Sequence, residues 1–155
     1  MELVVLMAPE SEAPSEFMFY LPGFRAFYAA EDATQTLHNL YTLHGAKVRD
    51  GLLWSKYLQA AIDMFGGDAQ MLFASHHWPT WGNERILPFL RGQRDMFRYL
   101  HDQTLRMANA GPMPLEIGEA IRVPDSIDTA LLLPKLPSNS VSRRTRAVQP
   151  SPLVL

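Results

Sequence analysis

Short apolar runs separated by turn residues occupy the first half of the chain, a pattern typical of β-strands. Strands are predicted at four places: residues 1–7, 17–21, 25–30 and 71–75. The first is expected to be buried, because its apolar run is continuous after Glu2. Pro22 and Gly23 predict a turn that pairs the second and third strands as a hairpin.

A helical spacing of apolar residues replaces this pattern from residue 50 onward. The first helix is predicted to begin after Asp50, a good N-cap residue, and to end at Gly66 and Gly67 with a left-handed glycine. The polar segment before it, residues 34–42, is expected to form an irregular loop or a short helix.

A second, longer amphipathic helix is predicted to begin at an N-cap formed by Asn83 and to end near residues 109–111. Pro88 lies about one turn inside it, where proline removes a backbone hydrogen bond, so a start nearer Leu87 is the alternative. One more short helix is predicted at 114–121.

Composition narrows the chemistry that this chain can perform. Its 155 residues are 47% hydrophobic and include no cysteine, which suits one soluble globular domain or part of one. The lack of cysteine excludes disulfides, thiolate-bound zinc, iron–sulfur clusters and a thiol nucleophile. Any metal ion must therefore be held by His, Asp and Glu.

Charge and hydropathy exclude two classes of partner. The 14 Lys and Arg residues against 16 Asp and Glu give a formal net charge of −2, which supplies no basic surface for nucleic acid. No apolar run approaches the ~20 residues that a membrane-spanning helix needs. Glu2 stands where a signal peptide would be basic, so none is predicted, and the cellular location is left open.

The end of the chain has a different composition from the rest. Residues 129–155 contain no acid, four prolines and scattered basic residues, so we expect a disordered tail. The predicted organisation is a partial domain over residues 1–82, a helical segment over 83–128, and this tail.

Oxygen and nitrogen ligands suited to a divalent cation follow three of the predicted strands: Glu12, Glu31 and His76, with His38 nearby in sequence. Each acid taken alone reads as an exposed surface side chain. His76 and His77 are neighbours, and a strand would point them to opposite faces, so at most one of them faces a given site.

Five separated strings carry a family resemblance: SEAPSEF at 11–17, AAE at 29–31, TLHNLYTL at 36–43, GAKVRD at 45–50 and SHHWPTWG at 75–82. In their sequence and their order, these strings, within residues 2 to about 128, resemble the alkylsulfatases of the metallo-β-lactamase fold. Those enzymes hydrolyse sulfate esters such as dodecyl sulfate.

The resemblance implies a fold and a site. The fold class is α/β, the second half of a metallo-β-lactamase-like αββα sandwich followed by helices. The site is a pair of Zn²⁺ ions in which Glu12 is a terminal ligand, Glu31 bridges both ions and His76 binds the second. His38 matches the general acid that would protonate the departing sulfate. Zinc lowers the pKa of bound water to about 7, which suits hydrolysis.

One departure from the family bears on activity. The His-x-His-x-Asp-His string that supplies the family's other zinc ligands does not occur in this sequence. The chain therefore reads as a fragment that begins inside the second half of the sandwich, and little or no turnover is expected from it alone. Family members are often periplasmic or secreted.

Two alternatives stay open beside the sulfatase interpretation. The chain could be a non-catalytic interaction module that forms a homodimer, or pairs with a full-length relative, through apolar helix stripes. It could also be another hydrolase of the same fold, acting on a lactone, thioester or phosphoester. The amino-acid sequence of residues 36–42 and the use of Glu rather than His ligands favour alkyl sulfates as the substrates.

Overall fold

The computed structural model describes residues 1–41 and 47–127. Its strands are β1 (Val4–Met7), β2 (Phe17–Leu21), β3 (Ala26–Tyr28), β4 (Met71–Phe73) and β5 (Thr80–Trp81). Its α-helices are α1 (Gly51–Ala61), α2 (Asn83–Asn109) and α3 (Pro114–Ala120), with a 3-10 turn at Pro22–Phe24 and a π turn at Ile62–Gly66. The predicted disordered tail lies outside the described residues.

The five strands form one sheet in the order β1-β2-β3-β4-β5. Neighbours are antiparallel except β3 and β4, which run parallel with Phe27 opposite Leu72. The hairpin predicted between residues 17–21 and 25–30 is confirmed as β2 and β3. The parallel pair matters for function, because the segments that leave β3 and β4 emerge at the same edge of the sheet.

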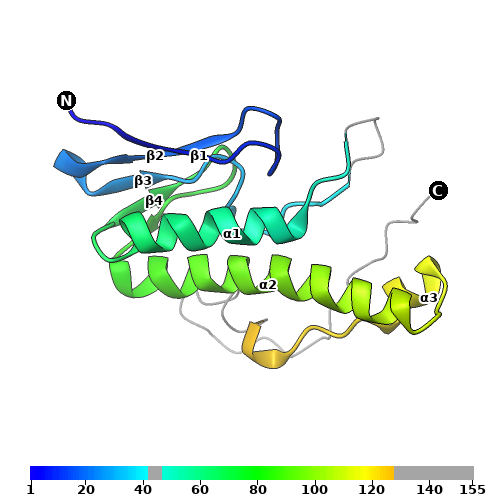
Figure 1. Cartoon of the computed structure of the whole chain (residues 1–155). Helices are drawn as coiled ribbons and strands as arrows, with labels where there is room; N and C mark the ends of the chain where they lie inside the picture. Colours follow the sequence, from blue (N-terminus) through cyan, green and yellow to red (C-terminus); the bar gives the residue numbers. More distant parts are fainter. Residues whose placement is uncertain (42–46, 128–155) are drawn as a thin grey trace.

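Helices α1 and α2 lie side by side against one face of this sheet (Figure 1). The core between the layers combines Met18, Phe27 and Leu72 from the sheet with Trp54 and Phe97 from the helices, all buried. Apolar residues of α1 and of the first half of α2 thus pack in the core. This two-layer arrangement, with a sheet and helices, confirms the predicted mixed α/β class.

The first strand is not buried as predicted. Its side chains alternate, and Val5 and Met7 are 44% and 55% exposed, while Val4 and Leu6 pack against the core. Phe17 on β2 is exposed on the same face. The reason is that successive side chains of a strand point to opposite faces, and the described helices cover only one face of the sheet.

The end of the first long helix also differs from the prediction. Gly67 has a φ of −75°, so the predicted left-handed glycine is wrong. The helix instead runs into the π turn, and the Asn83 side-chain amide donates to Gly66 O, the last carbonyl of that turn, at 2.5 Å and to Ala69 O, just before β4, at 3.0 Å. Long-range capping replaces the local cap.

This use of Asn83 explains a second correction. Its side chain binds Gly66 and Ala69, after α1, so Asn83 is the first residue of α2 and Gly82, with a φ of 87°, is the N-cap. The later start near Leu87 is also wrong, because Gly82 O already accepts the Ile86 amide at 3.0 Å. Pro88 is tolerated inside the helix, and α3 is confirmed.

Among the described residues, none of the helices combines the length and the apolar character that crossing a membrane requires.

Candidate metal centre

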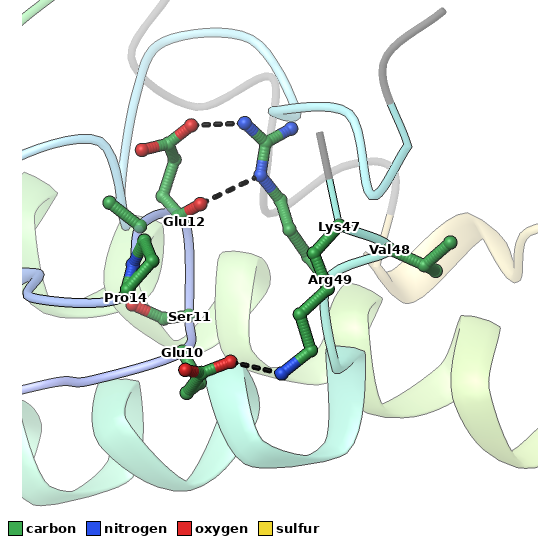
Figure 2. A pocket seen from close by; sticks show the side chains of 8 residues that line it. Glu10, Ser11, Glu12, Pro14, Lys47, Val48 and Arg49 are labelled. Atoms are coloured by element: carbon green, nitrogen blue, oxygen red, sulfur yellow. Dashed lines mark hydrogen bonds and ion pairs between the residues drawn. The ribbon is translucent and has the colours of Figure 1, made fainter. Parts of the chain in front are cut away.

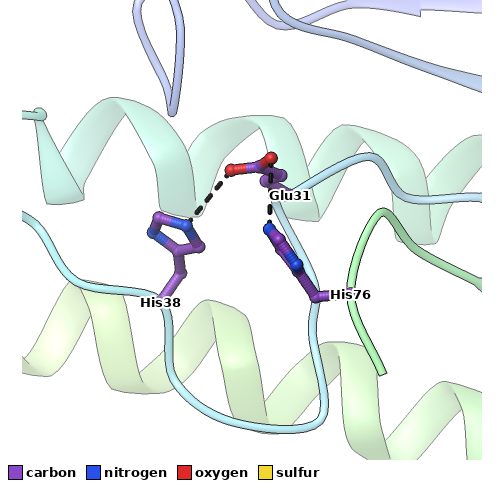
Figure 3. A group of neighbouring side chains, drawn as sticks. All are labelled: Glu31, His38 and His76. Atoms are coloured by element: carbon purple, nitrogen blue, oxygen red, sulfur yellow. Dashed lines mark ion pairs between the residues drawn. The ribbon is translucent and has the colours of Figure 1, made fainter. Parts of the chain in front are cut away.

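Three of the singled-out side chains converge at one edge of the sheet. Glu31 Oε2 lies 3.2 Å from His38 Nε2, and Glu31 Oε1 lies 3.3 Å from His76 Nε2, so each carboxylate oxygen faces one imidazole (Figure 3). One ligand atom from each residue lies within 4.8 Å of the other two. Two imidazoles and a carboxylate at this spacing are a donor set that suits zinc.

The parallel strands bring Glu31 and His76 together. Glu31 follows β3, and the preceding Ala30 has a left-handed φ of 49° that turns the chain at the strand end. His76 follows β4, and the two exits are joined because the Ser75 amide donates to Ala30 O at 2.9 Å. His77 has a φ of 68°, so His76 and His77 lie in a bend that follows β4 and are not neighbouring residues of a strand.

The third member, His38, is carried on a segment that helices hold in place. Residues 34–41 form no helix, so the irregular-loop alternative is the one observed for this part. The Trp54 indole donates to Asp32 O at 3.0 Å, and the Gln93 amide donates to Thr34 O at 2.8 Å, both from buried side chains. The Trp54 ring also lies 5.7 Å from the His38 ring.

Replacing Trp54 with Phe should lower the free energy of unfolding by about 1–2 kcal/mol, because it leaves Asp32 O without its buried donor. Trp54 is fully buried and stacks on Phe97 at 4.4 Å. Urea denaturation measures the change. Trp81→Phe, at a 57% exposed position, is the control and should change stability by less than about 0.5 kcal/mol. Equal effects of the two substitutions would contradict this role of Trp54.

Glu12, the other predicted ligand, does not belong to the three-residue group. Its carboxylate pairs with the Arg49 guanidinium, beside a pocket of about 230 Å³ (Figure 2). The pocket is lined by Glu10, Ser11, Glu12, Ala13, Pro14, Lys47, Val48 and Arg49. The ligand role of Glu12 stays a prediction, and Arg49 is a partner that the sequence reasoning did not single out.

Several carboxyl groups gather beside the site, and the pKa of two of them, Glu16 and Asp32, is raised. For Glu16, partial burial is the main cause of a raised pKa, followed by the charges of Glu12 and Glu31. Sequence reasoning treated Glu16 as a solvated neighbour. The negative potential of this cluster is a second feature, besides the ligand spacing, that fits a bound cation.

Asp32 is a further acid that sequence reasoning missed. It is fully buried, and neither carboxyl oxygen has a hydrogen-bond partner among the described residues. Burial, with the charges of Glu16, Glu12 and Glu31, raises its pKa to about 8. The Ser11 hydroxyl opposes the rise, but its proton is donated to Ala8 O at 2.7 Å. Asp32 is thus largely protonated at neutral pH in the folded chain.

Comparison with known proteins identifies the class first. No family model matches the chain. Its fold matches that of the stereoselective inverting sec-alkylsulfatase Pisa1 from Pseudomonas sp., with a TM-score of 0.79 and 32% identity over 85% of this chain and 23% of that one. The class is therefore the α/β fold of that solved alkylsulfatase.

Sequence relatives give the family. The chain is 51% identical to a linear primary-alkylsulfatase of Pseudomonas sp. over 124 residues, which are 80% of this chain and 18% of that protein. It is 48% identical to the alkyl/aryl-sulfatase BDS1 of Saccharomyces cerevisiae over 127 residues, 82% of this chain and 20% of that one. The chain is a homologue of the alkylsulfatases, as predicted, and spans about a fifth of their length.

Proposed function

We propose that this chain carries part of a zinc-dependent site for the hydrolysis of alkyl sulfate esters. The observation that carries the proposal is the Glu31 carboxylate lying between the His38 and His76 imidazoles, at nitrogen–oxygen distances of 3.2 and 3.3 Å. The alkylsulfatase homology supports the substrate class. The three residues lie at the sheet edge where β3 and β4 end, which is a rigid support for a site.

The residues divide into metal-holding and proton-transferring groups. Glu31 and His76 would hold zinc, with Glu12 as a further ligand. Bound zinc would supply a Lewis acid that polarises the ester and activates water. His38 would hold a proton at Nε2, the atom that faces Glu31 Oε2, and deliver it to the departing sulfate as the ester is hydrolysed.

Zinc titration of two histidine variants tests this division of roles. His76→Gln should weaken zinc binding at least tenfold, because it removes a ligand nitrogen. His38→Gln should leave the affinity within about threefold of the wild type, because a proton donor is not a ligand. His101→Gln, on α2 and paired with Asp102, is the control and should bind zinc normally. Equal losses in His38→Gln and His76→Gln would make His38 a third ligand instead.

Little or no turnover is proposed for the chain alone. The His-x-His-x-Asp-His string that supplies other ligands in the family is absent from its sequence. The test is dodecyl sulfate hydrolysis by purified chain with added zinc, followed beside metal analysis. Zinc binding without hydrolysis is the expected result, and turnover at an ordinary enzymatic rate would contradict it.

Self-association is a second candidate function, favoured by the exposed apolar side chains of the sheet. Val5, Met7 and Phe17 lie on the face that the described helices leave uncovered, whereas the helix stripes face the core. A second copy of the chain would bury this face. Light scattering during size-exclusion chromatography tests it: a dimer that Phe17→Ser turns into a monomer supports pairing, and a monomeric wild type excludes it.

A further inference from the structure

The side chain of Arg49 joins two segments that carry candidate site residues. Its side chain is 8% exposed, and its three nitrogens all donate hydrogen bonds, of which Figure 2 shows the two to Glu12. Nε donates to Glu12 O at 3.0 Å, and Nη2 donates to the Glu12 carboxylate. Nη1 donates to Asn39 O at 3.0 Å and also to the Asn39 side-chain oxygen. Asn39 directly follows His38.

The backbone of Arg49 is itself held in place. Its amide donates to Leu40 O at 2.9 Å, which ties it to the His38 segment a second time. The next residue, Asp50, caps α1, since its Oδ1 accepts the Leu52 and Leu53 amides at 2.9 and 3.0 Å. The guanidinium is therefore anchored at the start of a helix that belongs to the core.

We propose that Arg49 is a positioning residue that sets the separation between Glu12 and His38. A planar guanidinium has donors in a rigid fork, so it can bind both segments at once and fix their distance. It also holds one oxygen of Glu12, which fixes the orientation of that carboxylate. The inference deepens the proposed function, because Glu12 and His38 are the ligand and the proton donor suggested above.

Its contacts set Arg49 apart from a residue that only stabilises the fold. Among residues 1–41 and 47–127, its hydrogen bonds go to Glu12, Asn39 and Leu40, and none goes to the strands or to the interior of α1 and α2. Loss of the side chain should release the two segments while the core between sheet and helices stays folded. Loop mobility and zinc affinity are therefore expected to change more than thermal stability.

Amide hydrogen exchange in the metal-free chain is the first test. In Arg49→Met, exchange should rise at least tenfold over residues 10–16 and 38–41 and stay within twofold in α1 and α2. The control is Arg94→Met, whose guanidinium contacts Asp95 and Gln59 on the helices, and which should leave both segments unchanged. Wild-type exchange in the two segments of Arg49→Met would overturn the proposal.

Zinc titration of Arg49→Lys is the second test. Lysine keeps the charge but lacks the fork, so the affinity for zinc should fall at least tenfold, as in Arg49→Met, with a melting temperature close to that of the wild type. Asn39→Ala removes one partner of the fork and should produce a smaller loss that does not add to that of Arg49→Lys. Wild-type affinity in Arg49→Lys would overturn the proposal.

The two tests separate this inference from the metal site on which it rests. If the wild-type chain binds no zinc, the proposed function fails, and the exchange measurement alone decides whether Arg49 holds the two segments. If Arg49→Met does not fold, Arg49→Lys and Asn39→Ala decide in the same exchange assay: faster exchange over residues 10–16 and 38–41 supports the inference, and unchanged exchange overturns it.

Discussion

Glu31→Gln is expected to weaken zinc binding by at least 100-fold, or about 2.8 kcal/mol. Glu31 lies between the imidazoles of His38 and His76, and each of its two carboxylate oxygens faces one of these rings. Glutamine keeps the size but removes the negative charge and replaces one oxygen with an amide that is no ligand for zinc. Both imidazoles would remain, without the group that joins them.

Isothermal titration with zinc measures this loss. The matched control is Glu119→Gln, an exposed acid on α3, which should bind zinc as the wild type does. Circular dichroism of Glu31→Gln should be unchanged, because the side chain contributes nothing to the apolar core. Equal zinc affinity in Glu31→Gln and in the wild type would remove Glu31 from the site and end the ligand assignment.

Asp32→Asn should make the metal-free chain more stable, by an amount that grows with pH. The pKa of Asp32 is about 8 in the folded chain against a reference value of 3.8. Between these values the unfolded chain is ionised while the folded chain holds the proton, so wild-type stability falls as pH rises. Asparagine does not titrate. The gain should be small at pH 4, about 0.5 kcal/mol, and on the order of 5 kcal/mol at pH 8.

Urea denaturation with a chelator at pH 4.5, 6 and 8 measures this difference. Asp63→Asn, an exposed acid in the π turn that accepts the Gln59 amide at 2.7 Å, is the control and should show no such trend. A difference for Asp32→Asn that does not change with pH would contradict burial as the cause. So would a less stable Asp32→Asn at pH 8, since it would mean that the ionised carboxyl has a partner in the folded chain.

The two predictions describe one property of the site. Glu12, Glu16 and Glu31 share a region where burial, together with their negative charges, keeps Asp32 protonated, and Arg49 supplies a counter-charge on the Glu12 side. A cation beside Glu31 would reduce the repulsion that remains among these carboxylates. This physical reason for a metal is independent of the family resemblance, because it comes from burial and charge alone.

Several elements could be predicted because their signals are local. Strand β2 was predicted with its observed bounds, and Asp50 caps α1 as predicted, since the cap and the helix are adjacent in sequence. The prediction failed where a distant partner replaced a local one. Asn83 looks like an N-cap but its side chain binds the carbonyls of Gly66 and Ala69 after α1, and Gly67 there is not left-handed.

The sequence by itself determined which side chains are candidates for the chemistry and that the chain is related to the alkylsulfatases. Only the tertiary structure decided that Glu31, His38 and His76 meet, that Glu12 pairs with Arg49 instead, and that the Asp32 carboxyl is buried with no hydrogen-bond partner in the part of the chain that the structure describes. The physical reason is the sequence separation over which each interaction acts. Residue types and caps act over a few positions, whereas the meeting of Glu31 and His76 depends on the parallel pairing of β3 with β4, which are separated by a helix.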